Sequence, residues 1–161
     1  MMDRCNVLEL FSEKVCVRSN RLQQAKTELQ NLRYSVAGMW DRRYNNSTIT
    51  KSRTLLEEVF CFVIEKKGEK PTESGDIGKL YNQVKLLYHM HQSAELDKRI
   101  NGLLSGLEKI LSAIAEMRNK GSDAHGVGGK RININDYHAR LFVNSAMTMA
   151  DFILAVSEHA T

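Results

Sequence analysis

An arginine, an asparagine and a histidine lie within one short stretch of the chain, as Arg118, Asn119 and His125. An imidazole titrates near pH ~6.5, so His125 could take up or release a proton under physiological conditions. Arg118 stays charged, and its planar guanidinium can hold two phosphate oxygens at once. Asn119 could orient either partner but supplies no proton. These residue types suit the cleavage of RNA without a metal, which needs proton transfer and stabilisation of the charged phosphorane.

The residues around this stretch could assist the same chemistry. Lys120, Lys130 and Arg131 could follow an RNA backbone, a role whose mark is salt-sensitive binding. Asp123 could hold His125 or, equally, cap a short helix. The segment is a glycine-rich basic loop, but it lacks the Gly-Lys-Ser/Thr ending of a nucleotide-binding loop.

Each candidate also has a structural alternative. Arg118 could form a buried ion pair, and three carboxylates are possible partners: Glu57, Asp123 and Asp151. His125 could hydrogen-bond to nearby backbone at a helix end, and Asn119 could cap the helix C-terminus. We therefore keep open whether the arginine and the histidine act on a substrate or only stabilise packing.

The apolar pattern places Arg118 at the end of a helix. A predicted helix begins near Glu95 and is closed by Arg118; its apolar positions are Leu96, Ile100, Leu103, Leu107, Ile110 and Ile114. Leu104, Leu111, Arg118 and His125 follow one another at steps of seven residues, which is nearly a straight line on a helix. A cation that extends an apolar face is costly unless it is paired or lines a cleft.

The remaining segments also have helical spacing. One proline and few aromatic residues favour a mostly helical protein. We predict helices from near Thr48, after the capping residues Asn45 to Thr48, to about Gly68, and from Ile77 to about Met90. A last helix would be capped by Asp136; its residues Tyr137, Arg140 and Asn144 share a face, and Asn144 needs a hydrogen-bond partner in so apolar a helix. The alternating residues 131–135 form either a short strand or a loop.

The first part of the chain reads as one long helix. Apolar residues recur from Leu8 to Val36 at alternating steps of three and four, with Arg18 filling one step. The helix could lie across the rest of the domain, or it could self-associate, in which case Arg18 would weaken a simple dimer or fix its register. We divide the chain into this extension, residues 1–44, and a helical domain, residues 45–161.

Charge and composition limit the other classes. The net charge of +4 is compatible with a phosphate-bearing partner but does not require one. Three cysteines without paired spacing indicate reduced thiols. We found no apolar run near the ~20 residues that span a bilayer and no secretory signal, so we expect a soluble, cytoplasmic protein without membrane contact. His89 and His91 lack ligand-like neighbours, and we expect no metal and no cofactor.

The order of these motifs resembles the abortive-infection C-terminal family of HEPN helical domains. The resemblance covers roughly Asn45 to Val156 and rests on Ser52-Arg53-Thr54-Leu55-Leu56-Glu57, Arg118-Asn119-Lys120, Asp123-Ala124-His125-Gly126 and Val143-Asn144-Ser145-Ala146. The HEPN signature is an arginine, a polar residue, several residues and a histidine. The resemblance implies an all-α, HEPN-like bundle of about five helices, here with a long N-terminal helix. Many relatives resemble metal-independent ribonucleases that act as homodimers in antiphage or toxin systems, while others have lost activity.

The resemblance sharpens the expected site. We expect Arg118, Asn119 and His125 to be catalytic, Lys120, Lys130 and Arg131 to bind RNA, and Asp123, Arg140 and Asn144 to support them. Since one histidine cannot be both acid and base, we expect a twofold dimer to bring two Arg118/His125 pairs to one cleft. An inhibitor or sensor protein is a possible partner. The alternatives are a non-catalytic interaction module and a coiled-coil assembly protein that works through its first helix.

Overall fold

The structure is a computed structural model and describes residues 16–27, 31, 42–121 and 135–160. All regular structure in these ranges is helical. A first helical segment covers residues 16–27, and four helices follow: α2 (Arg42–Lys66), α3 (Ile77–Leu87), α4 (Lys98–Gly121) and α5 (Asp136–His159). The described part of the chain contains no strand, so the predicted all-α bundle of about five helices is confirmed. Of the strand or loop considered at 131–135, only Asn135 is described.

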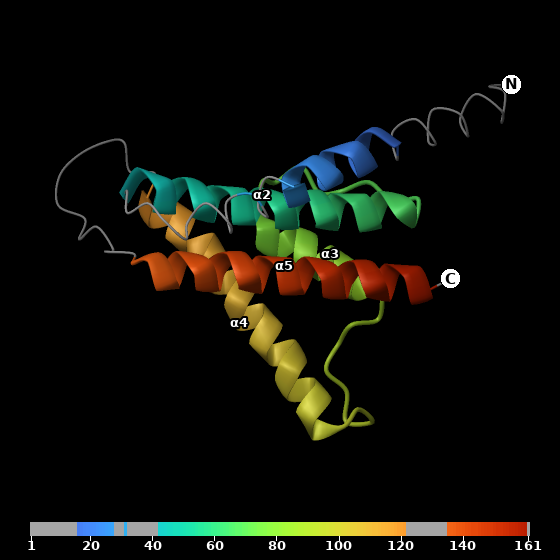
Figure 1. Ribbon diagram of the computed structural model, residues 1–161. Helices are drawn as coiled ribbons and strands as arrows, with labels where there is room; N and C mark the ends of the chain where they lie inside the picture. The colour runs from blue at the N-terminus through green and yellow to red at the C-terminus, as the bar shows by residue number, and fades with distance from the viewer. Residues whose placement is uncertain (1–15, 28–30, 32–41, 122–134, 161) are drawn as a thin grey trace, which may run out of the picture.

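The helices α2 and α5 form the centre of the bundle. They lie side by side with their C-terminal ends together (Figure 1), and α5 makes more contacts with α2 than with any other helix. At the shared end Lys66 donates from Nζ to the carbonyl of Ser157 at 2.9 Å. The helices α3 and α4 also pack on α2, and α4 crosses α5.

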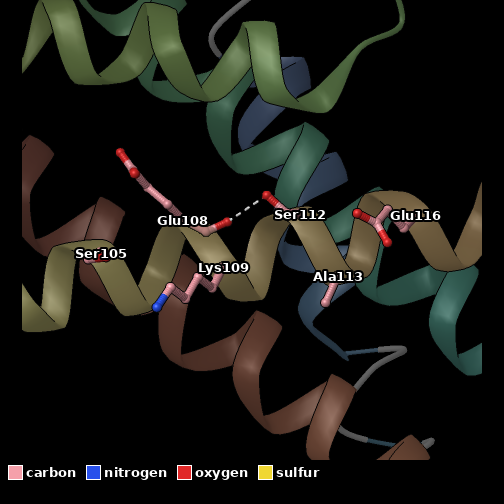
Figure 2. Close-up of a pocket in the computed structure, with 6 residues that line it drawn as sticks. All are labelled: Ser105, Glu108, Lys109, Ser112, Ala113 and Glu116. Carbon is pink, nitrogen blue, oxygen red and sulfur yellow. Dashed lines mark hydrogen bonds between the residues drawn. The ribbon is translucent and has the colours of Figure 1, made fainter.

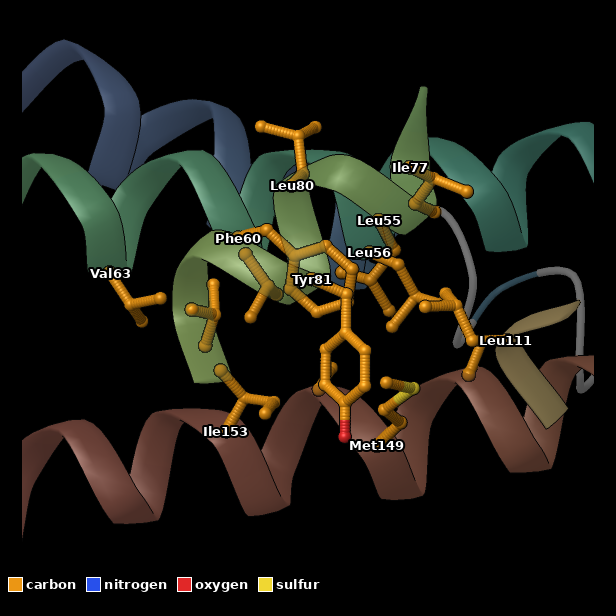
Figure 3. Close-up of a cluster of buried hydrophobic side chains, with 14 of the residues drawn as sticks. Leu55, Leu56, Phe60, Val63, Ile77, Leu80, Tyr81, Leu111, Met149 and Ile153 are labelled. Atoms are coloured by element: carbon orange, nitrogen blue, oxygen red, sulfur yellow. The ribbon is translucent and has the colours of Figure 1, made fainter. Parts of the chain in front are cut away.

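The core lies between these four helices. Its middle is the buried face of α2, where Leu55, Leu56 and Phe60 have no exposed surface. The ring of Phe60 lies 5.5 Å from that of Tyr81 on α3, and Leu111, Met149 and Ile153 close the cluster from α4 and α5 (Figure 3). The helical spacing of apolar residues gives each helix an apolar face. These faces pack against one another because each must be buried away from water.

Helix ends differ from the predicted ones by a few residues. The residues Asn45 to Thr48 lie inside α2 and do not cap it, and α2 ends at Lys66 ahead of Gly68, whose φ is +80°. His89 has a φ of 52°, outside the helical region, which stops α3 before Met90. Asp97 accepts from the backbone N–H of Arg99 at 2.8 Å, so α4 begins after Asp97.

The cap of α5 is also displaced by one residue. Asn135, not Asp136, is the N-cap, and its backbone N–H donates to Nδ1 of His138 at 3.4 Å. Short polar residues favour the N-cap position of a helix. Where several of them are adjacent, tertiary packing decides which one occupies it.

The long N-terminal helix that we predicted is not shown by the described residues. Its described part is residues 16–27, and most of the remaining predicted span from Leu8 to Val36 lies outside the described residues. This segment lies across the domain: Leu22 is buried, and Arg18 contacts Glu58 at 2.9 Å and Glu65 at 3.2 Å. Arg18 therefore interrupts the apolar repeat because it faces two carboxylates of α2.

Among the described helices, α5 is long and apolar enough to cross a membrane by length and composition. Core helices pass the same test, and α5 buries one whole face, including Val143, Ala146, Met149 and Ile153, in the bundle. The packing accounts for the apolar residues on that face of α5.

Candidate functional site

The last turn of α4 carries the arginine and asparagine of the candidate site. The helix continues to Gly121, so the structure places Arg118, Asn119 and Lys120 on one helical turn. The predicted end at Arg118 was three residues too early. Asp123, His125, Lys130 and Arg131 lie outside the described residues.

The helix that carries this turn is anchored in the core. Leu111 and Ile114 are buried, and position 118 follows both at helical spacing. The backbone at Arg118 is therefore held by packing one and two turns earlier. A group placed by a rigid helix is held more precisely than one placed by a loop.

Two of the three carboxylates that could neutralise Arg118 already contact other cations. Glu57 accepts from Nε of Arg53 at 2.7 Å. Asp151 is 68% exposed at its side chain and lies 3.5 Å from Nζ of Lys26. The side chain of Arg118 lies outside the described part of the structure, so the alternative of a buried ion pair for Arg118 stays a prediction.

Arg53 is the buried cation of the described structure. Its residue surface is only 6% exposed, its Nε donates to Glu57, and its Nη2 donates to the carbonyl of Gly75 at 2.8 Å. Both contacts satisfy a charge that would otherwise be costly to bury. Arg53 was noted in the sequence only as part of a motif. Its burial and its bond to the Gly75 carbonyl could not be predicted, because Gly75 lies in the loop before α3, far along the chain.

The two supporting residues on α5 lie on its outer face. Arg140 and Asn144 are exposed together with Tyr137, so the predicted shared face is confirmed. Asn144 is exposed, so water can serve as the hydrogen-bond partner that we expected for its amide; the sequence did not show this exposure. The reason is that α5 is apolar on two sides, and periodicity alone did not show which side is covered.

A shallow groove of about 420 Å³ runs along α4 just before the Arg118 turn (Figure 2). All its lining residues come from α4: Ser105, Glu108, Lys109, Ser112, Ala113 and Glu116. Glu108 accepts from Nζ of Lys85 at 2.7 Å, and the Ser112 hydroxyl donates to the Glu108 carbonyl at 3.0 Å. Charges of both signs line this open surface, which does not resemble an enclosed substrate pocket.

A family model described as a HEPN-like domain, Abi_C, matches residues 40–157. This range covers most of the chain and contains every candidate site residue. The chain belongs to the Abi_C family of HEPN-like domains. No curated protein and no solved structure gives a match.

The first helical segment lies outside the range of the family match. Residues 16–27 lie before the matched range, although they pack on it through Leu22 and Arg18. Burial lowers the pKa of Arg18, but its hydrogen bonds with Glu65 and Glu58 outweigh burial and raise that pKa above its ordinary value. The arginine thus stays charged in this contact.

Cys61 on α2 is a free cysteine of the HEPN-like domain. Burial raises the pKa of Cys61 to about 11, so its thiol stays protonated at neutral pH and is a poor nucleophile. Across residues 16–27, 42–121 and 135–160, no three His, Cys, Asp or Glu side chains gather as metal ligands would.

Proposed function

We propose that this HEPN-like protein is a metal-independent endoribonuclease that acts as a homodimer in prokaryotic antiphage or toxin-like defence. The observation that carries the proposal is the pair Arg118-Asn119 in the last turn of a core-anchored helix, within the family match and seven positions before His125. Membership of the family supports a role in abortive infection. The nuclease activity, the dimer and a cytoplasmic location are our inferences.

The chemistry assigns one task to each residue. Arg118 binds the scissile phosphate and stabilises the charge that develops on it. In the shared cleft of the dimer, His125 of one chain takes the proton of the 2′-hydroxyl as its oxygen attacks phosphorus, and His125 of the other chain protonates the 5′-oxygen as its bond to phosphorus breaks. Asn119 orients the phosphate or the imidazole. Lys120, Lys130 and Arg131 bind the flanking backbone, and Asp123 supports His125. The products are a 2′,3′-cyclic phosphate and a 5′-hydroxyl, and DNA resists because it lacks the attacking 2′-hydroxyl.

The test is an RNA cleavage assay in the presence of a chelator. We expect the wild-type protein to cleave RNA but not DNA of the same sequence, and His125→Ala to lose at least about a hundredfold in rate. Arg118→Ala should lose about as much, because it removes the group that stabilises the transition state. His91→Ala is the matched control, since His91 is an exposed histidine remote in sequence from the motif.

Two outcomes would contradict this function. Cleavage that persists in a folded His125→Ala protein would remove the histidine from the mechanism. Binding of RNA without any cleavage by the wild-type protein would favour a non-catalytic HEPN-like module, in which the same residues hold a phosphate. An inhibitor or sensor protein that keeps the enzyme inactive would be revealed by co-purification from the native host.

A further inference from the structure

Residues 16–27 form a helical segment whose charges are all positive. The cations are Arg18, Arg21 and Lys26, and the segment contains no aspartate or glutamate. Basic segments of this kind bind the phosphates of nucleic acids, with an affinity that falls as the salt concentration rises. The segment lies outside the range of the family match, so its role does not follow from the HEPN-like domain.

In the structure, carboxylates of the domain hold two of these cations. Arg18 donates from Nε and Nη2 to the two oxygens of Glu65, at 3.3 Å and 3.2 Å, and from Nη1 to Glu58 at 2.9 Å. Lys26 contacts Asp151 on α5 at 3.5 Å. An arginine binds a phosphate through the same two-point geometry that Arg18 uses with Glu65. The Glu65 carboxylate therefore occupies a position that a phosphate group could take.

The attachment of the segment is weak enough for its carboxylates to be exchanged for other anions. Leu22 is the one residue of the segment that is buried. The ion pairs are partly open to water, since the side chains of Arg18 and Glu65 are 22% and 20% exposed and that of Asp151 is 68% exposed. Partly exposed ion pairs contribute little to stability and are screened by salt. Charge, more than apolar contact, thus decides where the segment binds.

The segment is joined to the end of the bundle that carries the candidate site. Residues 28–41 connect it to Arg42, where α2 begins. The first turn of α2 lies at the same end of the bundle as the last turn of α4 (Figure 1). The 14 residues of this connection span at most about 50 Å. A released segment is therefore within reach of phosphates on either side of the Arg118 turn.

We propose that residues 16–27 are a second RNA-binding element, which carboxylates of α2 and α5 hold against the domain until RNA phosphates replace them. The inference rests on the proposed function for its ligand, because RNA bound at the Arg118 turn brings phosphates close to the tethered segment. Arg18 and Lys26 then bind the RNA backbone in place of the carboxylates. Without RNA, the carboxylates neutralise these two cations.

RNA fits this segment better than an acidic protein does. The carboxylates of a second protein would have to replace carboxylates of the same chain, which have the advantage of a high effective concentration. RNA overcomes this advantage because its other phosphates are already bound at the Arg118 turn. Its contact with the segment is then also an intramolecular step.

The first experiment measures the affinity of the full chain for a fluorescent 2′-O-methyl RNA, which lacks the attacking hydroxyl and stays intact. The double variant Glu58→Gln/Glu65→Gln removes the competing carboxylates and keeps every cation, so it should bind at least about threefold more tightly than the wild-type protein. Arg18→Gln lacks the same ion pairs and also the phosphate contact. It should bind at least about threefold more weakly than the double variant, with the salt dependence of log affinity reduced by about 0.7.

Matched controls change the net charge equally at exposed positions outside the segment. Glu69→Gln/Glu158→Gln matches the double variant, and Lys79→Gln matches Arg18→Gln. The RNA affinities of the controls give the effect of net charge alone, and the changes in the segment variants should exceed it. A merely structural role for the ion pairs would give the double variant and Arg18→Gln the same affinity once this effect is subtracted. Circular dichroism checks that all variants keep their helices.

The second experiment follows the release of the segment by the distance between two spin labels. The labels are attached through Ser19→Cys and Glu158→Cys, at exposed positions on the segment and on α5, in a chain whose native cysteines are replaced. Saturating 2′-O-methyl RNA should replace the distance of the docked segment with a longer and broader distribution. Leu22→Ala, which weakens docking, should shift the distribution in the same direction without RNA.

Three results would overturn this inference. They are a double variant that binds RNA no more tightly than its charge control, an Arg18→Gln protein that differs from the double variant only as the controls differ, and a label distance that saturating RNA leaves unchanged. Release of the segment by polyglutamate but not by RNA would instead assign it to an acidic protein. None of these measurements uses RNA cleavage, so the binding role of the segment and the proposed nuclease activity can fail separately.

Discussion

Asn144 shows which properties of a single residue the sequence predicts and which it does not. The sequence indicated correctly that Asn144 shares a face with Tyr137 and Arg140, because spacing along a helix fixes direction. The same spacing could not show that this face is exposed, since α5 has apolar residues on both sides. Likewise, the helix that carries Arg118 was predicted from its apolar repeat, whereas the pairing of Arg53 with the Gly75 carbonyl depends on a loop that periodicity does not describe.

Tyr81 makes the stability of the protein sensitive to alkali. Burial raises its pKa to about 12, and the nearby Glu108 carboxylate adds to this effect. A folded-state pKa above the unfolded one, about 10, contributes stability that is complete below pH ~10 and is lost as the pH rises towards 12. We expect the free energy of unfolding, measured with urea, to fall over this range.

The variant Tyr81→Phe separates this effect from general alkaline denaturation. It keeps the ring against Phe60 and removes the ionisable hydroxyl, so the fall in stability above pH ~10 should be smaller than in the wild-type protein. Tyr88→Phe is a useful comparison, because it also removes a buried hydrogen bond of 2.8 Å to the Val63 carbonyl and should lower stability at neutral pH by about 1 kcal/mol. An unchanged alkaline profile for Tyr81→Phe would contradict the assignment.

At the scale of elements, the existence of each helix was easier to predict than its ends. The apolar repeats of α2, α3, α4 and α5 each produced a helix, since burial of a stripe drives folding more strongly than local propensity. Their starts depended on which polar residue became the cap. The four adjacent residues Asn45 to Thr48 could each cap a helix, and α2 nevertheless begins before them, at Arg42.

The first helical segment should detach when its central contact is removed. Leu22 is its one buried apolar residue, and the flanking ion pairs are partly exposed and contribute little on their own. We expect Leu22→Ala to weaken docking of residues 16–27 by about 2 kcal/mol. Hydrogen exchange of this segment should accelerate while that of α2 is unchanged. Val17→Ala, at an exposed position, is the control.

The ion pairs of this segment can be tested by charge reversal. Arg18→Glu would face Glu58 and Glu65 with a like charge and should accelerate exchange in residues 16–27. Combination with Glu58→Lys and Glu65→Lys should restore protection. If exchange in the segment is insensitive to all these changes, its docking does not depend on the contacts described.

At the scale of the whole molecule, the homodimer of the proposed function decides how the candidate site is shared. The last turn of α4 and the first turn of α5 lie at the same end of the molecule (Figure 1). A twofold dimer that brings the two Arg118/His125 pairs to one cleft supplies both an acid and a base. In a dimer without such a cleft, each Arg118 would act only with the His125 of its own chain.

A mixed dimer distinguishes these arrangements. Arg118→Ala and His125→Ala chains, co-expressed with different tags and purified as the heterodimer, contain no chain with both residues intact. Because the shared cleft needs both histidines, we expect a wild-type/His125→Ala heterodimer to lose far more than half of the wild-type rate, and the first heterodimer to be no more active. About half the wild-type rate from the wild-type/His125→Ala heterodimer would show that each chain cleaves RNA on its own, against a shared cleft.

The dependence of α2 on α5 has a consequence for synthesis in the cell. The face of α2 that carries Leu55, Leu56 and Phe60 is covered to a large part by a helix that begins seventy residues after α2 ends. While the ribosome is still translating the intervening segments, this apolar face of α2 remains uncovered and prone to aggregation. A message broken before the codons for α5 would therefore yield a chain that chaperones and proteases recognise as incomplete.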